Sequence, residues 1–264
     1  MAEDKTPSQC FEELKDDILA IPDDAIAYSK MPYEEAMQEG QRVSTLVEKY
    51  HDNLINSDIN PALLDTIGTR SGAFAHSVAV MDSFVKISES HIEIYQKKKK
   101  EGYEIRRRLL ETLEYVFRFD KAVLDILDNI KNGAGDLDMI RDLNSIHLLC
   151  KNNQDRLTKA HVEQSLIDQA LEYYTELSQL TAQIDIDPKR INEAKQVCAK
   201  AWTYLWEAMT EIYAAGRYVF YDEPDIQELF YIDYYQRIRK IRKKTEEENL
   251  PEETESPETS TTSL

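Results

Sequence analysis

The sequence has few of the residues that interrupt regular structure: glycine occurs 7 times and proline 8 times among 264 residues. A strand-rich fold needs a turn roughly every ten residues, and turns draw heavily on these two residue types. Their scarcity between long stretches of helically spaced apolar residues argues against a sandwich or barrel. We therefore predict an all-α fold.

Long apolar runs are also missing. No segment approaches the roughly 20 apolar residues that span a bilayer, and the charged residues at 3–5 do not fit a signal peptide. Cysteine is scarce: Cys10, Cys150 and Cys198 are far apart and form no CxxC pair. This spacing argues against a zinc finger and favours reduced, buried thiols. We expect a cytoplasmic protein without membrane insertion.

Motifs that carry catalysis or bind cofactors are absent. The chain has no GxxxxGK[ST] or GxGxxG loop, no HExxH motif and no GxSxG turn. A di-iron bundle needs two Glu-x-x-His motifs, and the one match runs from Glu48 to His51. Because one match arises by chance in a charged helix, we predict no cofactor, no metal and no enzymatic activity. The alternative is a metal-binding or enzymatic bundle with a polar core site at Glu48 and His51.

Positive charge is in deficit. The chain has 32 Lys and Arg against 50 Asp and Glu, a formal net charge of -18. Segment 244–264 holds seven Glu and one Lys, so it contributes -6 and leaves -12 for the rest. Since this segment has no aromatic residue, we expect a disordered acidic tail at 244–264 after a helical bundle at 1–243. The negative total disfavours nucleic acid and anionic lipid as partners.

Five prolines stand where helices should begin, because capping or acidic residues adjoin them. They are Pro7, Pro32, Pro61, Pro188 and Pro224. We expect a turn at the glycines of 133–135, and a break or bend at 97–102, where four lysines and a glycine interrupt an apolar stripe. The basic residues at 97–100 and 106–108 are interpreted as a solvated helix face.

Two seven-residue series interlock between residues 191 and 219. Bulky apolar residues form one series and alanines the other: Ile191, Cys198, Leu205, Ile212 and Val219; Ala194, Ala201, Ala208 and Ala215. Methyl-sized positions let a neighbouring helix approach closely. Such heptads with short connections predict a mostly antiparallel bundle of about six to eight helices with coiled-coil-like packing. It is either one domain or two sub-bundles, 8–131 and 136–243.

Aromatic residues crowd segment 204–235, and basic residues follow at 237–244. Tyrosine and arginine anchor many protein interfaces, so one interpretation is a docking surface. The other is that tyrosines fill the end of the bundle while basic residues complement a helix dipole. The basic run also suits a contact with the acidic tail. The candidate partner-binding residues are Tyr231, Tyr234, Tyr235, Arg237, Arg239 and Arg242.

Segments 201–208 and 215–220 resemble the closing helix of some bacterial all-helical proteins of unknown function. The resemblance implies a bacterial source and no particular activity. From the residues themselves we predict a non-enzymatic interaction or structural protein that acts through protein-protein contacts. Its partner is either another protein at the C-terminal surface or a second copy in a homo-oligomer. We do not expect it to bind nucleic acid.

Overall fold

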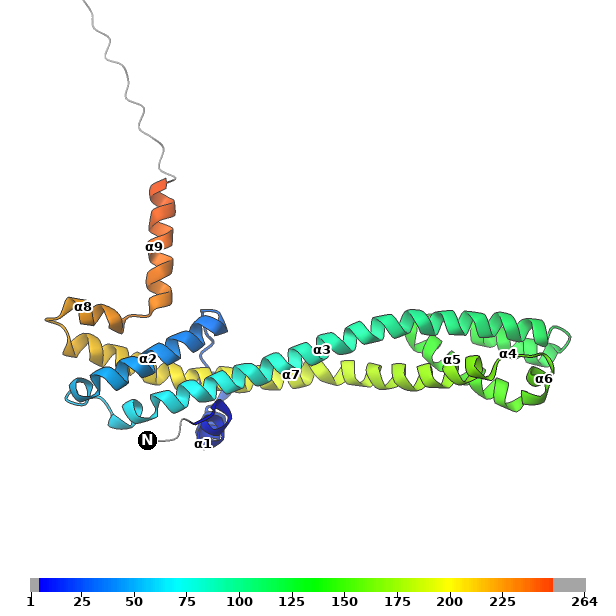
Figure 1. Cartoon of the computed structure of the whole chain (residues 1–264), viewed down its shortest axis with the longest axis horizontal. Helices are drawn as coiled ribbons and strands as arrows, with labels where there is room; N and C mark the ends of the chain where they lie inside the picture. The colour runs from blue at the N-terminus through cyan, green and yellow to red at the C-terminus, as the bar shows by residue number, and fades with distance from the viewer. Residues whose placement is uncertain (1–4, 249–264) are drawn as a thin grey trace, which may run out of the picture. The chain divides into compact units, whose positions relative to one another are not determined.

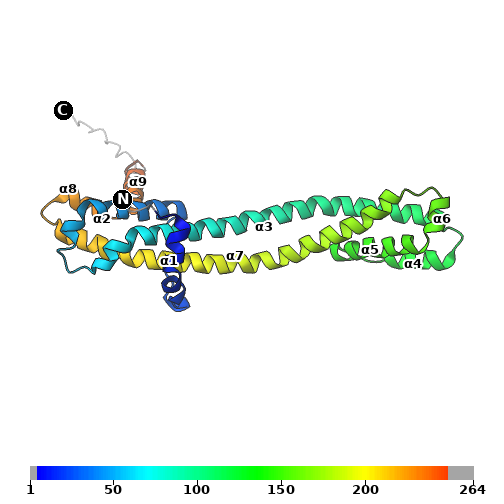
Figure 2. The same cartoon turned by 60° about the horizontal axis from the view of Figure 1, so that its bottom comes forward.

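The computed structural model describes residues 5–248, with side chains to Thr245 (Figures 1 and 2). This range contains helices and no strand, so the predicted all-α bundle is confirmed. The elements are α1 (Pro7–Ala20), η1 (Asp23–Ala25), α2 (Tyr33–Leu54), α3 (Pro61–Val116), α4 (Lys121–Lys131), α5 (Asp136–Asn152), α6 (Gln154–Lys159), α7 (Gln164–Val219), α8 (Pro224–Gln227), η2 (Glu228–Phe230) and α9 (Asp233–Glu248). None of these helices is long and apolar enough to cross a membrane.

The chain divides into two compact units. Unit 1 comprises Met1–Val78 and Val197–Leu264, and unit 2 comprises Ala79–Gln196. Their bounds differ from the sub-bundles 8–131 and 136–243, because α3 and α7 each contribute to both units and the loop at 132–135 lies inside unit 2.

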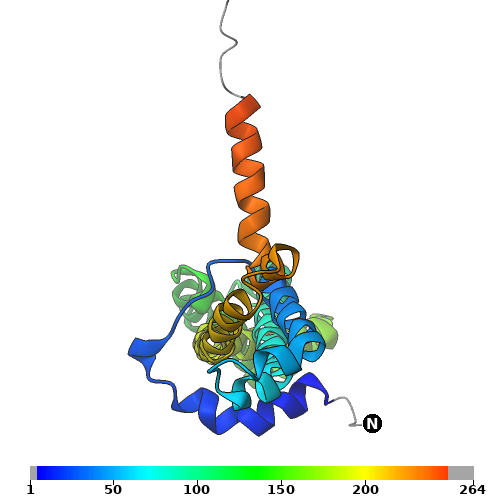
Figure 3. The same cartoon turned by 90° about the vertical axis from the view of Figure 1, so that its left-hand side faces the viewer.

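Three helical segments form the centre of unit 1: α2, the first turns of α3 and the last turns of α7 (Figure 3). They meet at Gly40, where a Cβ would lie 2.8 Å from the Ser71 hydroxyl and 3.1 Å from Leu205. The alanine series takes part in this packing, since Ala201 and Ala208 are buried.

Helix α1 crosses α3 and α7 within unit 1 (Figure 2). It begins with a capping box between Thr6 and Gln9, as its proline predicted. Cys10 packs against Gly72 of α3, where a Cβ would lie 2.7 Å from the sulfur. On α7, Tyr204 donates a hydrogen bond of 3.2 Å to Asp17. These contacts close the groove between α3 and α7.

Unit 2 has its own apolar core, built from α4, α5, α6 and parts of α3 and α7. Its largest fully buried side chains include Phe117, Leu127 and Leu143. Asp120 caps α4 by accepting from the amide of Val123 at 3.3 Å. The predicted turn at 133–135 is confirmed.

The predicted break at 97–102 is wrong, because α3 is continuous from Pro61 to Val116. Gly102 is buried, and a Cβ there would lie 3.1 Å from Leu177 and 3.2 Å from Met139. Lys98 pairs with Glu176 at 2.5 Å, and Lys99 with Asp136 at 3.0 Å. These lysines therefore fasten α3 to its neighbours instead of forming a solvated face.

The helix start predicted at Pro188 is also wrong, since Pro188 lies inside α7. The side chain of Asp187 accepts from His91 at 2.8 Å and so does not cap a helix. A proline inside a helix removes one backbone hydrogen bond, and here the flanking turns continue regardless. The starts at Pro7, Pro32, Pro61 and Pro224 are confirmed.

Helix α9 extends to Glu248, so the first five residues of segment 244–264 are helical. The rest of the predicted acidic tail lies outside the described residues. Cys10, Cys150 and Cys198 are buried and form no disulfide within the described range. Burial raises the pKa of the Cys150 thiol to about 11.

Candidate functional site

The C-terminal segment is anchored by Phe230. Its ring is fully buried and lies on the backbone of Gly216 in α7, where a Cβ would overlap ring carbons. The ring also stacks on Phe220 at 5.6 Å and contacts Tyr50 of α2 at 5.9 Å between centroids. Phe230 therefore holds η2 against both α2 and α7.

Two arginines fix the backbone around Phe230. Arg42 of α2 donates to the carbonyl oxygens of Leu229 and Tyr231, the second at 3.1 Å. Arg217 of α7 donates to the carbonyl oxygen of Phe230 at 2.9 Å. Since three successive carbonyls are held by side chains from two helices, the start of α9 is placed firmly.

A buried carboxylate joins this network. Glu39 is 4 % exposed, pairs with Arg42 at 2.9 Å and accepts a hydrogen bond from the Tyr213 hydroxyl. The amide of Asp233, the first residue of α9, donates to the same carboxylate at 3.4 Å. Burial, followed by the negative charge of Glu39, raises the pKa of Tyr213. Tyr213 therefore stays neutral and acts as a donor.

A groove of about 240 Å³ lies between α7 and the start of α9. We call it the C-terminal groove. It combines aromatic side chains with two guanidinium groups, and its lining residues are Trp206, Thr210, Tyr213, Arg217, Tyr231, Ile232, Tyr235, Gln236 and Arg239. The Arg217 guanidinium lies 5.1 Å from the centroid of the Tyr231 ring. Such a surface suits apolar groups flanked by carboxylates.

Three of the six candidate residues line this groove: Tyr231, Tyr235 and Arg239. The other three do not. Arg237 is occupied by Glu35 at 2.5 Å and Asp233 at 2.7 Å, which raise its pKa. The Tyr234 ring contacts that of Tyr235 at 5.4 Å, and Arg242 is exposed further along α9.

The aromatic residues of segment 204–235 lie partly in the core and partly at the surface. Tyr213, Phe220 and Phe230 are buried, whereas Tyr218 and Tyr221 are 77 % and 70 % exposed. Part of this segment therefore fills the core of unit 1, and part of it lies at the surface.

The contribution of α7 to the groove was not predicted from the sequence. Trp206, Thr210, Tyr213 and Arg217 follow one another at steps of four, three and four residues. This stripe lies on one face of a helix, beside the heptad series of residues 191–219. A second helical stripe that ends in arginine was the available signal.

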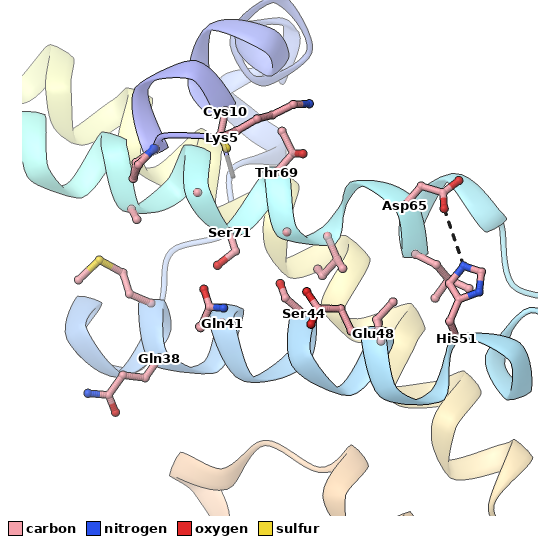
Figure 4. A pocket seen from close by; sticks show the side chains of 18 residues that line it. Lys5, Cys10, Gln38, Gln41, Ser44, Glu48, His51, Asp65, Thr69 and Ser71 are labelled. Carbon is pink, nitrogen blue, oxygen red and sulfur yellow. Dashed lines mark ion pairs between the residues drawn. The ribbon is translucent and has the colours of Figure 1, made fainter. Parts of the chain in front are cut away.

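Glu48 and His51 lie in a different place, the α2/α3 groove (Figure 4). This groove has a volume of about 980 Å³ and is open to solvent. His51 Nε2 is 3.8 Å from Asp65, and His51 Nδ1 is 3.7 Å from Asp52. Within residues 5–248, no group of three or more His, Cys, Asp or Glu is arranged to hold a metal ion.

No protein-family model, curated protein or solved structure matches the chain.

Proposed function

We propose that this chain is a non-enzymatic helical interaction protein whose C-terminal groove binds an acidic segment of a partner protein. The observation that carries the proposal is the convergence of Trp206, Tyr231 and Tyr235 with Arg217 and Arg239 from two helices. Aromatic residues and arginine dominate the binding energy of many interfaces, since they offer rigid area and polar groups together.

The charge of the groove supports an acidic partner. Among the described residues, neither Arg217 nor Arg239 forms an ion pair, although acidic residues outnumber basic ones across the chain. A guanidinium that bonds only to a carbonyl retains donors for a carboxylate. The partner segment therefore places an apolar side chain against the aromatic rings and flanks it with Asp or Glu.

Fluorescent peptides with one leucine, phenylalanine or tryptophan among glutamates test this proposal. We expect saturable binding by fluorescence anisotropy, and weaker binding as salt rises, because Arg239 is exposed to solvent and Arg217 is only partly buried. Peptides with lysine in place of glutamate should not bind. Absence of binding by every acidic peptide contradicts the proposal.

Two matched variants locate the binding surface. Arg239→Glu should weaken acidic peptides about tenfold or more, because it reverses a charge in the groove. Lys240→Glu makes the same change one residue further on α9, outside the groove, and should have a much smaller effect. Equal losses in the two variants contradict the assigned surface.

We further propose that the protein acts in a reducing compartment, the cytoplasm. The three buried cysteines form no disulfide within the described residues, and the cytosol keeps such thiols reduced. Cell fractionation with an antibody against the chain tests this location, and recovery from an oxidising compartment contradicts it.

A further inference from the structure

The three-helix centre of unit 1 has three outer grooves, and the chain covers two of them. Helix α1 covers the groove between α3 and α7, through Cys10 on Gly72 and Asp17 on Tyr204. The η2 turn and the start of α9 cover the groove between α2 and α7, through Phe230. The start of α1 borders the third, the α2/α3 groove, through Lys5, Pro7 and Cys10, and leaves it open to solvent.

The floor of the α2/α3 groove has room for a helix. It extends beside α2 from Met37 to His51, about four helical turns or 20 Å. Its centre is lined by small residues, and a Cβ on Gly68 would have one neighbour within 4.0 Å, the Ser44 hydroxyl. Small residues at such positions allow close approach of another backbone.

A polar group in this floor lacks a partner. Ser71 is 6 % exposed, and its side chain points from α3 toward α2 in Figure 4. Its hydroxyl makes no hydrogen bond with the described residues, unlike Ser44, which donates to Gly40 at 3.0 Å. Within residues 5–245, no fully buried side-chain nitrogen or oxygen lacks a hydrogen-bond partner. Because the Ser71 hydroxyl has no such partner, it must be accessible from the groove. An accessible hydroxyl at this place is available to bond to a group that enters the groove.

One end of the groove is acidic, and the lysine that also lines the groove, Lys5, is paired with Glu13. Glu48 and Asp65 lie at or near one end, and no lysine or arginine among the described residues pairs with either. A fitting occupant is therefore a basic helix with a narrow apolar stripe.

The chain itself exposes such a helix. On α9, Ile238 and Ile241 share a face, and Ile241 is 64 % exposed. This face differs from the Tyr235 and Arg239 face that lines the C-terminal groove. Lys240 is also exposed and forms no ion pair with the described residues.

We propose that α9 of a second copy of this chain occupies the α2/α3 groove. Charge complementarity supports this occupant, since a basic helix meets the acidic end of the groove. Its length is compatible too, because the part of α9 beyond Arg237, residues 238–248, extends for about 16 Å and fits within the groove. Reciprocal insertion closes a two-fold dimer, the commonest symmetry of homo-oligomers. In its own copy α9 is held to α2 by Arg237 and Glu35 and points away from the three-helix centre (Figure 3).

Sedimentation over a range of concentrations tests the dimer. Wild type should associate, and Gly68→Leu and Ile241→Asp should each weaken association about tenfold or more, because one fills the groove and the other charges the inserted stripe. Both sites are exposed, so circular dichroism should show unchanged helix content. Gly68→Ala is the matched control and should associate like wild type. A monomeric wild type, or a Gly68→Leu protein that dimerises normally, overturns the proposal.

Mixing the two defective variants gives a sharper result. The Gly68→Leu protein retains a normal α9, and the Ile241→Asp protein retains an open groove. Together they should form a one-to-one complex through one productive contact, at concentrations where each variant alone is mostly monomeric. A mixture that remains monomeric overturns the assignment of α9 as the occupant.

Discussion

The ring of Phe230 occupies the space that a side chain on Gly216 would fill. Glycine inside a helix costs about 1 kcal/mol relative to alanine, so its presence near the end of α7 needs a reason. The reason is this contact, which lets η2 lie directly on the α7 backbone. Both walls of the C-terminal groove depend on it, because α7 provides one and the segment after Phe230 the other.

Gly216→Ala should therefore destabilise unit 1 by about 1–3 kcal/mol, the usual cost of overpacking. Trp202 and Trp206, the two tryptophans of the chain, both lie in unit 1, so denaturant unfolding followed by their fluorescence reports on it. Binding of acidic peptides should weaken in the same variant. Gly68→Ala is the control, and it should gain up to about 1 kcal/mol from helix propensity. A Gly216→Ala protein as stable as wild type contradicts the packing described.

The hydrogen bond from Tyr213 to Glu39 gives a second prediction. Tyr213→Phe removes a bond to a buried charge and should lower stability by about 1.5–3 kcal/mol at neutral pH. Tyr218→Phe, at a side chain that is 77 % exposed, should change little.

The same residue predicts a pH dependence. The pKa of Tyr213 is raised in the folded state, so its contribution is complete below the unfolded value near 10 and declines as the pH rises above it. The wild type should lose stability above about pH 10 more steeply than Tyr213→Phe. Parallel declines in urea titrations at several alkaline pH values argue against a raised pKa at Tyr213.

Local signals in the sequence predicted local structure. The cap at Thr6 is made by a neighbour three residues away, and Asn60 accepts from the amide of Ala62, two residues away. Such contacts depend on a few adjacent residues, which explains why four of the five proline-marked starts are present.

Distant partners decided the features that the sequence did not reveal. Gly102 stays helical because Met139 and Leu177 pack on it, and Asp187 is taken by His91, 96 residues away. The C-terminal groove follows the same rule. Tyr231, Tyr235 and Arg239 were identified by composition, but Trp206 and Arg217 join them only once η2 folds back on α7.

Asp136 gives a prediction for unit 2. Its carboxylate accepts from Lys99 and Tyr103 at 3.0 Å and from Tyr95 at 3.4 Å, and the lysine is the main cause of its lowered pKa. A lowered carboxyl pKa adds stability above the unfolded value near 4, and this is lost as the pH falls through the folded value. Asp136→Asn should therefore cost about 1 kcal/mol at pH 7, since the pair is partly solvated.

The cost of Asp136→Asn should vanish in acid, below the folded pKa of the carboxyl. Hydrogen exchange of the α5 amides at several pH values measures it within unit 2. Asp125→Asn, on the exposed side of α4, is the control and should have no such dependence. An Asp136→Asn effect that is constant with pH shows that the carboxylate charge is not involved.

The pair of His91 and Asp187 supports a last prediction, on how unit 2 tolerates a carboxylate between α3 and α7. The Asp187 side chain is 6 % exposed and lies 2.8 Å from His91 Nδ1, its hydrogen-bond partner. His91→Ala leaves this carboxylate buried and unpaired, so it should cost about 3 kcal/mol or more. In a protein that already carries Asp187→Ala, the same change should cost much less, because no charge is left without a partner. A double-mutant cycle measures the difference as a coupling energy. Additive effects of the two substitutions contradict an energetic coupling between His91 and Asp187. They also remove the explanation for why Asp187 does not begin a new helix at Pro188.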